Sequence, residues 1–369
     1  MSAAAGRPVS VVLAGGGTAG HTSPLIATAH ELTRLDPTVT LTAVGTARGL
    51  ETSVVPAAGL TLRLIPPVPL PRKPGLDLAR VPQRLWRAVA EAAALLRSVD
   101  ADVVLGFGGY VSTPVYLAAR RLRVPIVIHE QNAVPGLANR MAARFTSSVF
   151  VSFPDTSLPG ASCIGLPLRR AIVELDRPAR RRAARAQFGL DPDLATLLVS
   201  GGSQGAMSIN QAVLGARQSL GARGIQVLHV LGPKNLGDSR AETDPTTGAV
   251  YRPVAYVERM EEAYAAADLM LGRCGASTVL ETAAVGLPAV FVPYPHGNGE
   301  QARNAALVVQ AGGGELVADA ECTAEWAARR LPELIGDPEV LRGMSEATSR
   351  VGHRDAAATL AARTLEVVR

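Results

Sequence analysis

Cysteine is scarce in this 369-residue sequence, and no apolar run is long enough to cross a membrane. The three cysteines, Cys163, Cys274 and Cys322, are odd in number and far apart. They fit neither a disulfide framework nor a CxxC zinc site, so we expect reduced thiols. The longest uncharged run, residues 194–216, contains four glycines and several polar residues, which excludes a transmembrane helix. The apolar segment near the N-terminus is too short for a signal peptide, and we therefore expect a cytosolic protein.

Lysine is nearly absent, and aromatic residues make up only 4% of the chain. Lys73 and Lys234 are the only lysines, and neither sits in a glycine loop, which argues against a P-loop or Schiff-base lysine. Residues 1–165 contain 15 Arg and Lys against 9 Asp and Glu, whereas the remainder contains 22 against 23. A basic first half predicts an anionic partner, which could be nucleic acid, an anionic membrane face or a phosphorylated substrate. The few aromatics and lysines argue against nucleic acid.

Short apolar strands alternate with amphipathic helices along the chain, which predicts parallel α/β layers. We predict strands at residues 9–14, 39–44, 62–65, 103–105, 126–129, 149–151, 195–200, 225–230, 250–254, 269–271, 289–292 and 315–317. Proline, glycine and an arginine-dense helical segment at 177–185 predict an interdomain connection within residues 165–193.

The second half restarts with a strand, a glycine loop and a helix, as the first half does. We therefore predict two Rossmann-like domains facing a central cleft, at residues 1–165 and 166–352. The last helix has no strand after it, so residues 353–369 are expected to pack back on the first domain.

The glycine loop GGGTAGH at residues 15–21 follows the first predicted strand and opens a helix. Its bare amides and the positive end of the helix dipole predict an anion site, although the glycines could serve only a tight turn. Gly15, Gly17 and Gly20 match the GxGxxG fingerprint, but the second strand ends without the acid that holds the ribose of NAD. His21 stands where a Walker A loop has lysine, which argues against ATP hydrolysis.

Two further glycine loops, at residues 106–110 and 201–205, also follow predicted strands. Ligands of open α/β sheets bind at such strand ends. His21 lies at the end of its loop and is our candidate general base, since an unperturbed histidine titrates near cytosolic pH. The alternative is a helix-terminal residue hydrogen-bonded to the backbone.

Polar side chains follow two other strands. His129, Glu130, Gln131 and Asn132 could form a sugar-binding rim, whereas a buried hydrogen-bond network would explain only one or two of them. In the second half, Glu281 lies about two turns into a helix that starts after a strand end. There a carboxylate can accept both hydroxyls of a ribose while the helix amides take phosphate. An exposed helix glutamate is the alternative.

Taken together, these motifs resemble the MurG family of bacterial cell-wall glycosyltransferases. The resemblance rests on GGGTAGH (15–21), GFGGY (106–110), HEQN (129–132), GGSQGA (201–206), RCGASTVLE (273–281) and GLPAVFVPYP with GNGEQ (286–301). It implies the two-domain glycosyltransferase-B fold, with the lipid acceptor on the first domain and UDP-N-acetylglucosamine on the second. It also implies an inverting transfer of N-acetylglucosamine to the C4 hydroxyl of the muramyl sugar of lipid I, giving lipid II.

Site residues follow from the same resemblance. Its substrate-binding positions are Thr18, Ala19, Gly20, Asn132, Arg169, Ser203, Tyr256, Val257, Ala276, Ser277, Thr278, Val279, Leu280, Glu281 and Gln301. Glu281 would hold the ribose, the Val257 backbone the uracil, and Gln301 with Asn132 the transferred sugar. Helix amides around Ser203, together with Arg169, would stabilise the departing UDP, so no metal ion or other cofactor is expected. Leu166, Cys274 and Glu300 depart from the residues that are frequent in the family.

A lipid acceptor requires contact with a bilayer. Residues 70–76 and the following Leu78, Arg80, Arg84, Leu85, Trp86 and Arg87 mix apolar and basic side chains, as an interfacial patch on an anionic membrane would. The alternative is a helix packed on the core with a solvated basic face. We thus expect a peripheral protein at the cytoplasmic face of the membrane, without a nucleic-acid partner. Competing functions are a UDP-sugar epimerase, another transferase of this fold, and a non-catalytic nucleotide-sugar-binding protein.

Overall fold

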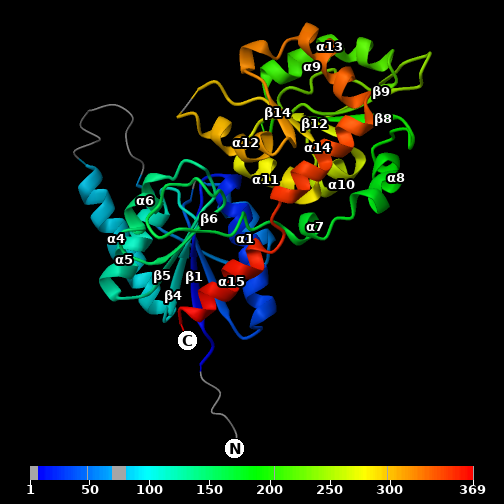
Figure 1. Ribbon diagram of the computed structural model, residues 1–369. Coiled ribbons are helices and arrows are strands. Elements are labelled where there is room, and N and C mark those ends of the chain that lie inside the picture. The colour runs from blue at the N-terminus through cyan, green and yellow to red at the C-terminus, as the bar shows by residue number, and fades with distance from the viewer. Residues whose placement is uncertain (1–6, 48, 69–79, 203, 297, 369) are drawn as a thin grey trace, which may run out of the picture. The chain divides into compact units, whose positions relative to one another are not determined.

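The computed structural model describes residues 7–47, 49–68, 80–202, 204–296 and 298–368. The chain divides into two compact units, which we call unit 1 (residues 1–169 and 354–369) and unit 2 (residues 170–353). Each unit consists of a sheet with helices on both faces (Figure 1). The predicted α/β class is confirmed.

Unit 1 contains a fully parallel seven-stranded sheet in the order β3-β2-β1-β4-β5-β6-β7. Its strands are β1 (Ser10–Ala14), β2 (Thr40–Gly45), β3 (Thr61–Leu64), β4 (Val103–Gly106), β5 (Ile126–Glu130), β6 (Ser148–Val151) and β7 (Ser162–Cys163). The chain runs outward from β1 in one direction and from β4 in the other. The switch point therefore lies between β1 and β4, where open α/β sheets bind their ligands.

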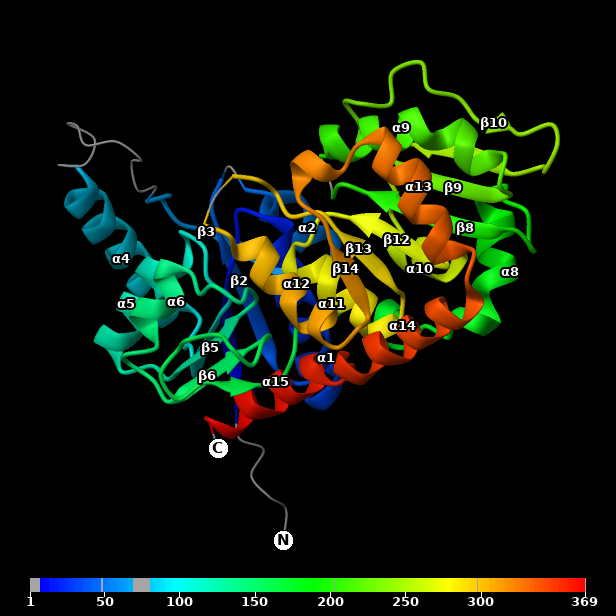
Figure 2. The ribbon, with the colours of Figure 1, turned by 45° about the horizontal axis from the view of Figure 1, so that its top comes forward.

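Both faces of this sheet are covered by helices, so its central strands are apolar throughout. Val11 and Leu13 pack beneath α1 (Ala19–Leu35), α2 (Glu51–Ala57) and α15 (Ala356–Glu366). Val12 and Val104 pack beneath α4 (Val81–Ser98), α5 (Ser112–Leu122) and α6 (Leu137–Ala142). Helix α15, at the red end of the chain, runs beside α1 and places Leu360 in this core (Figure 2).

Unit 2 repeats this plan with a seven-stranded sheet in the order β10-β11-β9-β8-β12-β13-β14. Its strands are β8 (Ala195–Ser200), β9 (Ile225–Val230), β10 (Glu242–Thr243), β11 (Val250–Val254), β12 (Leu269–Gly272), β13 (Ala289–Phe291) and β14 (Gly314–Leu316). All pairs are parallel except β10 with β11. The switch point here lies between β8 and β12.

The helices of unit 2 also cover both faces of its sheet. They are α7 (Arg170–Val173), α8 (Arg177–Gln187), α9 (Met207–Gly221), α10 (Met260–Ala266), α11 (Ala276–Val285), α12 (Glu300–Gln310), α13 (Ala324–Ile335) and α14 (Pro338–Val351), with a 3-10 turn at Asp319–Glu321. Helices α9 and α13 pack together on the face that carries Leu197 and Val199.

The arginine-dense segment, which the sequence suggested as a connection, is helix α8 and belongs to unit 2. It packs on α10, and the completely buried Arg185 donates to the Ala266 carbonyl (2.9 Å) and to Asp268 (2.7 Å). Arg177 donates to backbone carbonyls where two helices end, from Tyr264 and Ala267 at α10 and from Val285 and Gly286 at α11. Such carbonyls have no partner within their own helix, so Arg177 ties the two helix ends together.

None of the helices in the described ranges is long and apolar enough to cross a membrane.

Candidate active site

The loops that follow β1 and β4 pack against each other at the switch point of unit 1. The Phe107 amide donates to the Ala14 carbonyl (2.7 Å), and the Ser112 hydroxyl donates to the same oxygen (2.9 Å). Gly109 lies so close to Gly16 that a Cβ there would stand 2.8 Å from the Gly16 oxygen. Only glycine permits this approach, so the two loops form one backbone-lined surface at the carboxyl edge of the sheet.

His21 lies in the first turn of α1, next to Thr18. Its Nδ1 is 2.8 Å from the Thr18 hydroxyl oxygen, and its amide donates to the Thr18 carbonyl. When Nδ1 carries the proton and donates it to Thr18, the Nε2 lone pair can accept a proton from a ligand. Burial lowers the pKa of His21 from its ordinary 6.5, although the negative charge of Glu51 opposes this shift. The imidazole is therefore neutral near pH 7, as a general base must be.

Glu51 is a residue of this region that sequence reasoning missed. It begins α2, and its carboxylate accepts from the Gly17 amide and from the Thr46 amide, both at 2.8 Å. Burial by itself would raise the pKa of Glu51, but these hydrogen bonds outweigh burial and lower it. The carboxylate beside the glycine loop thus comes from the next helix and not from the end of β2, and it is bound to the protein backbone. No spacing rule for nucleotide sites points to it.

The four polar residues at the end of β5 and just after it, His129 to Asn132, do not form a common rim. His129, Glu130 and Gln131 are each at most 2% exposed, and His129 Nε2 donates to the Gly165 carbonyl (2.9 Å). Burial lowers the pKa of His129 to about 4, so this imidazole is neutral. The Glu130 carboxylate accepts from the Asn132 amide (3.0 Å) and shapes the turn. The buried-network interpretation therefore holds for three residues, and only Asn132 reaches the surface.

Glu281 in unit 2 is buried rather than exposed. It lies in α11, which starts at Ala276 after β12, and its side chain is 8% exposed. Its Oε2 accepts a 2.7 Å hydrogen bond from the Tyr264 hydroxyl on α10. The sequence alternative of a solvent-exposed helix glutamate is therefore wrong, and Tyr264 is a second residue that the sequence did not reveal.

Gln301, in the first turn of α12, has a defined amide orientation. Its Oε1 accepts from the Tyr294 amide (2.9 Å) and from the more distant Cys274 thiol (4.0 Å). Burial raises the pKa of Cys274 to about 12, so the thiol keeps its proton. With Oε1 bound to the protein, Nε2 is the group of Gln301 that can donate to a ligand.

Arg273 braces the strand ends around this site. It donates to the Val292 carbonyl (3.1 Å) and the Pro293 carbonyl (3.0 Å), and it pairs with Asp319 at 2.5 Å. Asp319 also accepts from the Ser208 hydroxyl in the first turn of α9 (2.7 Å). One guanidinium therefore connects the ends of β12 and β13 with the start of α9.

The remaining predicted residues divide between the two units. Thr18, Ala19, Gly20 and His21 share the β1–α1 turn, Asn132 follows β5, and Arg169 is the last residue of the first segment of unit 1. In unit 2, the exposed Tyr256 and the buried Val257 follow β11, Ala276, Ser277, Thr278, Val279, Leu280 and Glu281 begin α11, and Gln301 lies near the start of α12. Ser203 lies outside the described residues. Within the described ranges, no three His, Cys, Asp or Glu side chains are grouped as metal ligands would be.

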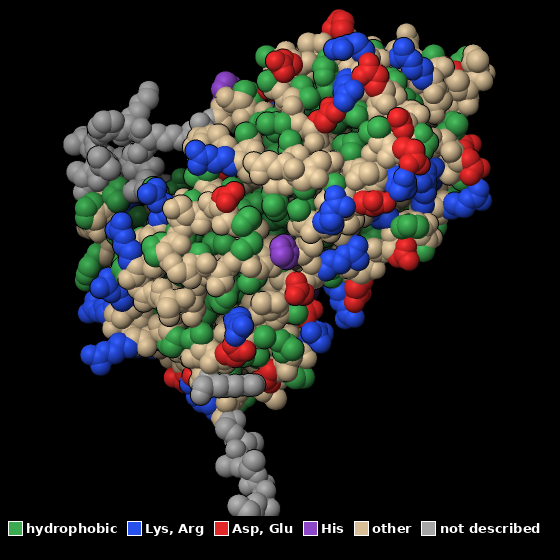
Figure 3. Space-filling view, in the orientation of Figure 1, with side chains coloured by type: hydrophobic (Ala, Val, Ile, Leu, Met, Phe, Trp, Pro, Cys, Tyr) green, Lys and Arg blue, Asp and Glu red, His purple; other side chains and the backbone are tan. Residues whose placement is uncertain are grey.

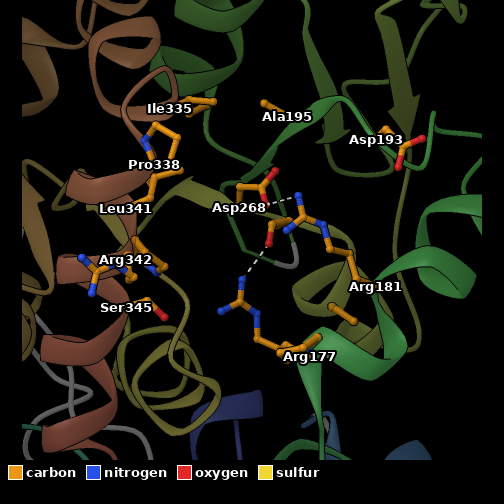
Figure 4. Close-up of a pocket in the computed structure, with 14 residues that line it drawn as sticks. Arg177, Arg181, Asp193, Ala195, Asp268, Ile335, Pro338, Leu341, Arg342 and Ser345 are labelled. Carbon is orange, nitrogen blue, oxygen red and sulfur yellow. Dashed lines mark hydrogen bonds and ion pairs between the residues drawn. The ribbon is translucent and has the colours of Figure 1, made fainter.

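A cavity of about 540 Å³ lies at the opposite, amino-terminal edge of the unit 2 sheet (Figure 4). Its polar groups are bound to the protein: Arg181 pairs with Asp268 (2.8 Å), and Arg177 donates to the helix-end carbonyls described above. The cavity begins where β8 and β12 begin, so it is separate from the strand ends that carry the predicted site.

Comparisons with known proteins identify relatives over nearly the whole chain. The glycosyltransferase family 28 N-terminal domain matches residues 11–151, and the family 28 C-terminal domain matches residues 196–360. A protein of Mycolicibacterium paratuberculosis is 57% identical over 369 residues, covering 98% of this chain and 90% of its own. One from a Nocardioides species is 57% identical over 357 residues, covering 97% of this chain and 98% of its own. Both are named UDP-N-acetylglucosamine–N-acetylmuramyl-(pentapeptide) pyrophosphoryl-undecaprenol N-acetylglucosamine transferase.

Solved structures are also similar to this chain over nearly its whole length. The crystal structure of Acinetobacter baumannii MurG superposes with a TM-score of 0.78 at 25% identity, covering 97% of this chain and 100% of that one. A UDP-GlcNAc 2-epimerase from Neisseria meningitidis, bound to UDP-GlcNAc, has a TM-score of 0.67 at 13% identity, covering 97% and 100% of the two chains. The epimerase shares the fold alone.

Proposed function

The chain belongs to glycosyltransferase family 28, and on that basis we propose its function. It is a UDP-N-acetylglucosamine-dependent N-acetylglucosaminyltransferase that acts on lipid I to give lipid II, for peptidoglycan synthesis. The observation that carries this function is the 57% identity, over 98% of the chain, with a relative of that name.

The donor binds to unit 2 in this proposal. Oxygens of the buried Glu281, oriented by Tyr264, accept the two ribose hydroxyls, while Tyr256 stacks near a uracil held by the Val257 backbone. The amides of Ala276, Ser277 and Thr278 in the first turn of α11, and the loop that contains Ser203, bind the diphosphate, because helix N-termini attract anions. Gln301 donates from Nε2 to a hydroxyl of the transferred sugar.

The acceptor binds to unit 1, at the joined glycine loops after β1 and β4. Their backbone amides suit the diphosphate of a lipid-linked sugar. Thr18, Ala19 and Gly20 form the start of α1 beside His21. The C-terminal helix α15 belongs to this acceptor unit because it packs on α1.

Inverting transfer requires that the acceptor hydroxyl lose its proton as it attacks the anomeric carbon. His21 accepts that proton on Nε2, since its Nδ1 is bound to Thr18 and its imidazole is neutral. The bond between the anomeric carbon and the UDP oxygen breaks as the new glycosidic bond forms. Helix amides and Arg169 stabilise the negative charge that develops on UDP.

The enzyme associates with a membrane because its acceptor is a lipid, and we propose the cytoplasmic face, where nucleotide sugars are available. The contact surface is the amino-terminal part of α4, where Trp86 is 70% exposed and Arg80, Arg84 and Arg87 lie on the same helix or at its cap. Figure 3 shows Arg side chains beside apolar ones along this side of unit 1. Such a surface fits anionic lipid headgroups, and no nucleic-acid partner is expected. The predicted residues 70–76 and Leu78 lie outside the described residues.

Transfer of radiolabelled N-acetylglucosamine from UDP to an extractable polyprenyl lipid tests the function. The wild-type protein is expected to label lipid I, and Glu281→Gln is expected to lower this activity by weakening donor binding. Formation of an epimerised UDP-sugar in place of labelled lipid would overturn the proposal. Binding of UDP-N-acetylglucosamine without any turnover would support the non-catalytic alternative instead.

A further inference from the structure

The Glu51 side chain is 1% exposed although it lies at the functional edge of unit 1. Its Oε2 accepts from the Gly17 amide (2.8 Å) and its Oε1 accepts from both the Thr46 amide (2.8 Å) and the Thr46 hydroxyl (3.1 Å). One carboxylate therefore joins the loop after β1 to the loop after β2. A buried carboxylate that receives several hydrogen bonds is stable as an anion.

Glycines make room for this carboxylate on several sides. A Cβ on Gly16 would lie 2.6 Å from Oε1, and a Cβ on Gly45 or Gly49 would overlap the Glu51 side chain. The glycine loop is thus built around Glu51 as well as for an external anion. This use of glycine differs from the dinucleotide fingerprint, in which a free acid at the end of the second strand holds a ribose.

The residue that Glu51 binds, Gly17, directly precedes Thr18, whose hydroxyl contacts His21. Glu51 binds the Gly17 amide, Thr18 follows in the chain, and the Thr18 hydroxyl lies 2.8 Å from His21 Nδ1. Gly17 has a φ of +90°, a conformation that other residues seldom adopt. Its amide is held in this conformation by the hydrogen bond to Glu51. Glu51 is thus connected to the imidazole by two hydrogen bonds, which the peptide link between Gly17 and Thr18 joins.

From this arrangement we infer that Glu51 is a positioning residue of the transfer reaction, which fixes the glycine loop so that Thr18 can orient the His21 imidazole. The inference rests on the proposed function, because it gives Glu51 a role through His21 and none in contact with substrate.

The charge of Glu51 adds a second, measurable effect. Burial lowers the pKa of His21 and the Glu51 anion opposes this, so the anion keeps the imidazole a stronger base than its surroundings alone would allow. Other elements packed near His21 also matter for its pKa. The β4–α5 loop, which packs on the glycine loop, contributes Phe107 and Gly109, which are uncharged. On α15, which packs on α1, Arg363 and Glu366 pair with each other.

The test compares Glu51→Gln with the matched variant Asp102→Asn. Asp102 accepts from the Ser10 amide (2.8 Å) and pairs with Arg7 at the amino-terminal edge of the same sheet, far along the strands from the glycine loop. The glutamine at position 51 keeps the size of the side chain but loses the charge and places an amide donor against a backbone donor. Lipid-labelling kinetics across pH and side-chain NMR titration of the histidines are measured for both variants, with His21→Gln to assign the His21 signal.

For Glu51→Gln we expect kcat to fall roughly tenfold to a hundredfold, with the calorimetric affinity for UDP unchanged. The acid limb of the kcat profile and the NMR titration of His21 are both expected to move to lower pH. Asp102→Asn is expected to change neither kcat, nor the acid limb of its pH profile, nor the NMR titration of His21. If Glu51→Gln is too unstable to study, Thr46→Val, which removes only the hydroxyl donor to Oε1, is expected to give a smaller loss in kcat.

Two results would overturn the inference. If the His21 titration in folded Glu51→Gln is the same as in wild type, Glu51 does not affect the pKa of His21. If kcat also equals that of wild type, Glu51 does not position the imidazole. Failure of the proposed function looks different, since then the wild-type protein would not label the lipid at all while the NMR titration still reported on Glu51 and His21.

Discussion

The hydroxyl of Tyr264 on α10 donates a 2.7 Å hydrogen bond to Oε2 of Glu281 on α11. Both side chains are almost completely buried, at 2% and 8% exposure. This contact fixes the carboxylate of the residue to which we assign the ribose. The hydrogen bond between α10 and α11 thus orients the Glu281 carboxylate. Its loss should weaken donor binding more than it slows the chemical step.

Tyr264→Phe is therefore expected to weaken UDP binding roughly tenfold to a hundredfold, because a buried hydrogen bond to a carboxylate contributes roughly 1.5–3 kcal/mol. The kcat at saturating donor should change little. Tyr251→Phe is the matched control, since Tyr251 is also buried and bonds His229 elsewhere in the same unit (3.0 Å). Calorimetry with UDP decides the matter, and equal affinity of Tyr264→Phe and wild type would contradict the assignment.

Gln301→Glu is expected to separate recognition of the sugar from recognition of the nucleotide. The new carboxylate can still accept from the Tyr294 amide but cannot donate from the position of Nε2. Affinity for UDP should stay the same, while UDP-N-acetylglucosamine should bind no more tightly than UDP. Gln310→Glu, at the exposed end of the same helix, is the control. Retained preference for the full donor would show that Gln301 does not donate to the sugar.

His21→Ala is expected to lower kcat by a factor of about 10² or more, with donor affinity nearly intact. In the wild type, burial lowers the pKa of His21, so protonation of the base should stop the reaction only below pH 6.5. Activity is thus expected to rise with pH through that lowered pKa and to stay level above it. His30→Ala, at an exposed position on the same helix, should behave as wild type. Near-normal turnover in His21→Ala would assign the base elsewhere.

Arg177→Ala is expected to destabilise unit 2 by about 3 kcal/mol, because it leaves buried helix-end carbonyls without donors. Arg182→Ala on the same helix should cost at most about 1 kcal/mol, since the ion pair of Arg182 with Asp193 is 74% and 73% exposed. Urea unfolding followed by circular dichroism measures both. A similar midpoint for the two variants would mean that the carbonyls find other donors.

Trp86→Glu combined with Arg80→Ala and Arg84→Ala is expected to abolish flotation with vesicles that contain anionic lipid. The exposed indole and the nearby guanidinium groups are the part of the α4 surface that the structure describes. Val340→Glu on unit 2, where the side chain is 41% exposed, serves as the control and should float like wild type. If the triple variant also floats like wild type, the membrane surface lies elsewhere on the protein.

Periodicity and glycine punctuation predicted the main strands, because buried parallel strands are continuous apolar runs. The sequence did not predict β7 (Ser162–Cys163) and β10 (Glu242–Thr243), since two residues at a sheet edge carry no periodic signal. The glycine loops and Glu281 were identified from motifs. Glu51 and Tyr264 were not, because their partners come from other elements and only the folded chain brings them together.

Burial also decided two alternatives that the sequence left open. His129, Glu130 and Gln131 look like a polar rim in the sequence, yet the first two lie in the buried end of β5 and the third is buried directly after it. Glu281 looks like an ordinary surface glutamate, yet α11 lies with its whole second turn packed. Which polar side chains of a helix or strand are buried depends on the elements that pack against it. The pattern of a single sequence does not show which elements those are.

Helix α15 gives the chain an unusual order of assembly. Leu360, Ala361 and Leu365 share one core with Val11 and Leu13, although the whole of unit 2 lies between them in the sequence. A ribosome that has translated residues 1–169 has therefore not yet made the helix that completes the core of unit 1. Unit 2 can complete its folding as soon as it emerges, whereas the core of the unit that is begun first closes only after residues 356–366 have been translated.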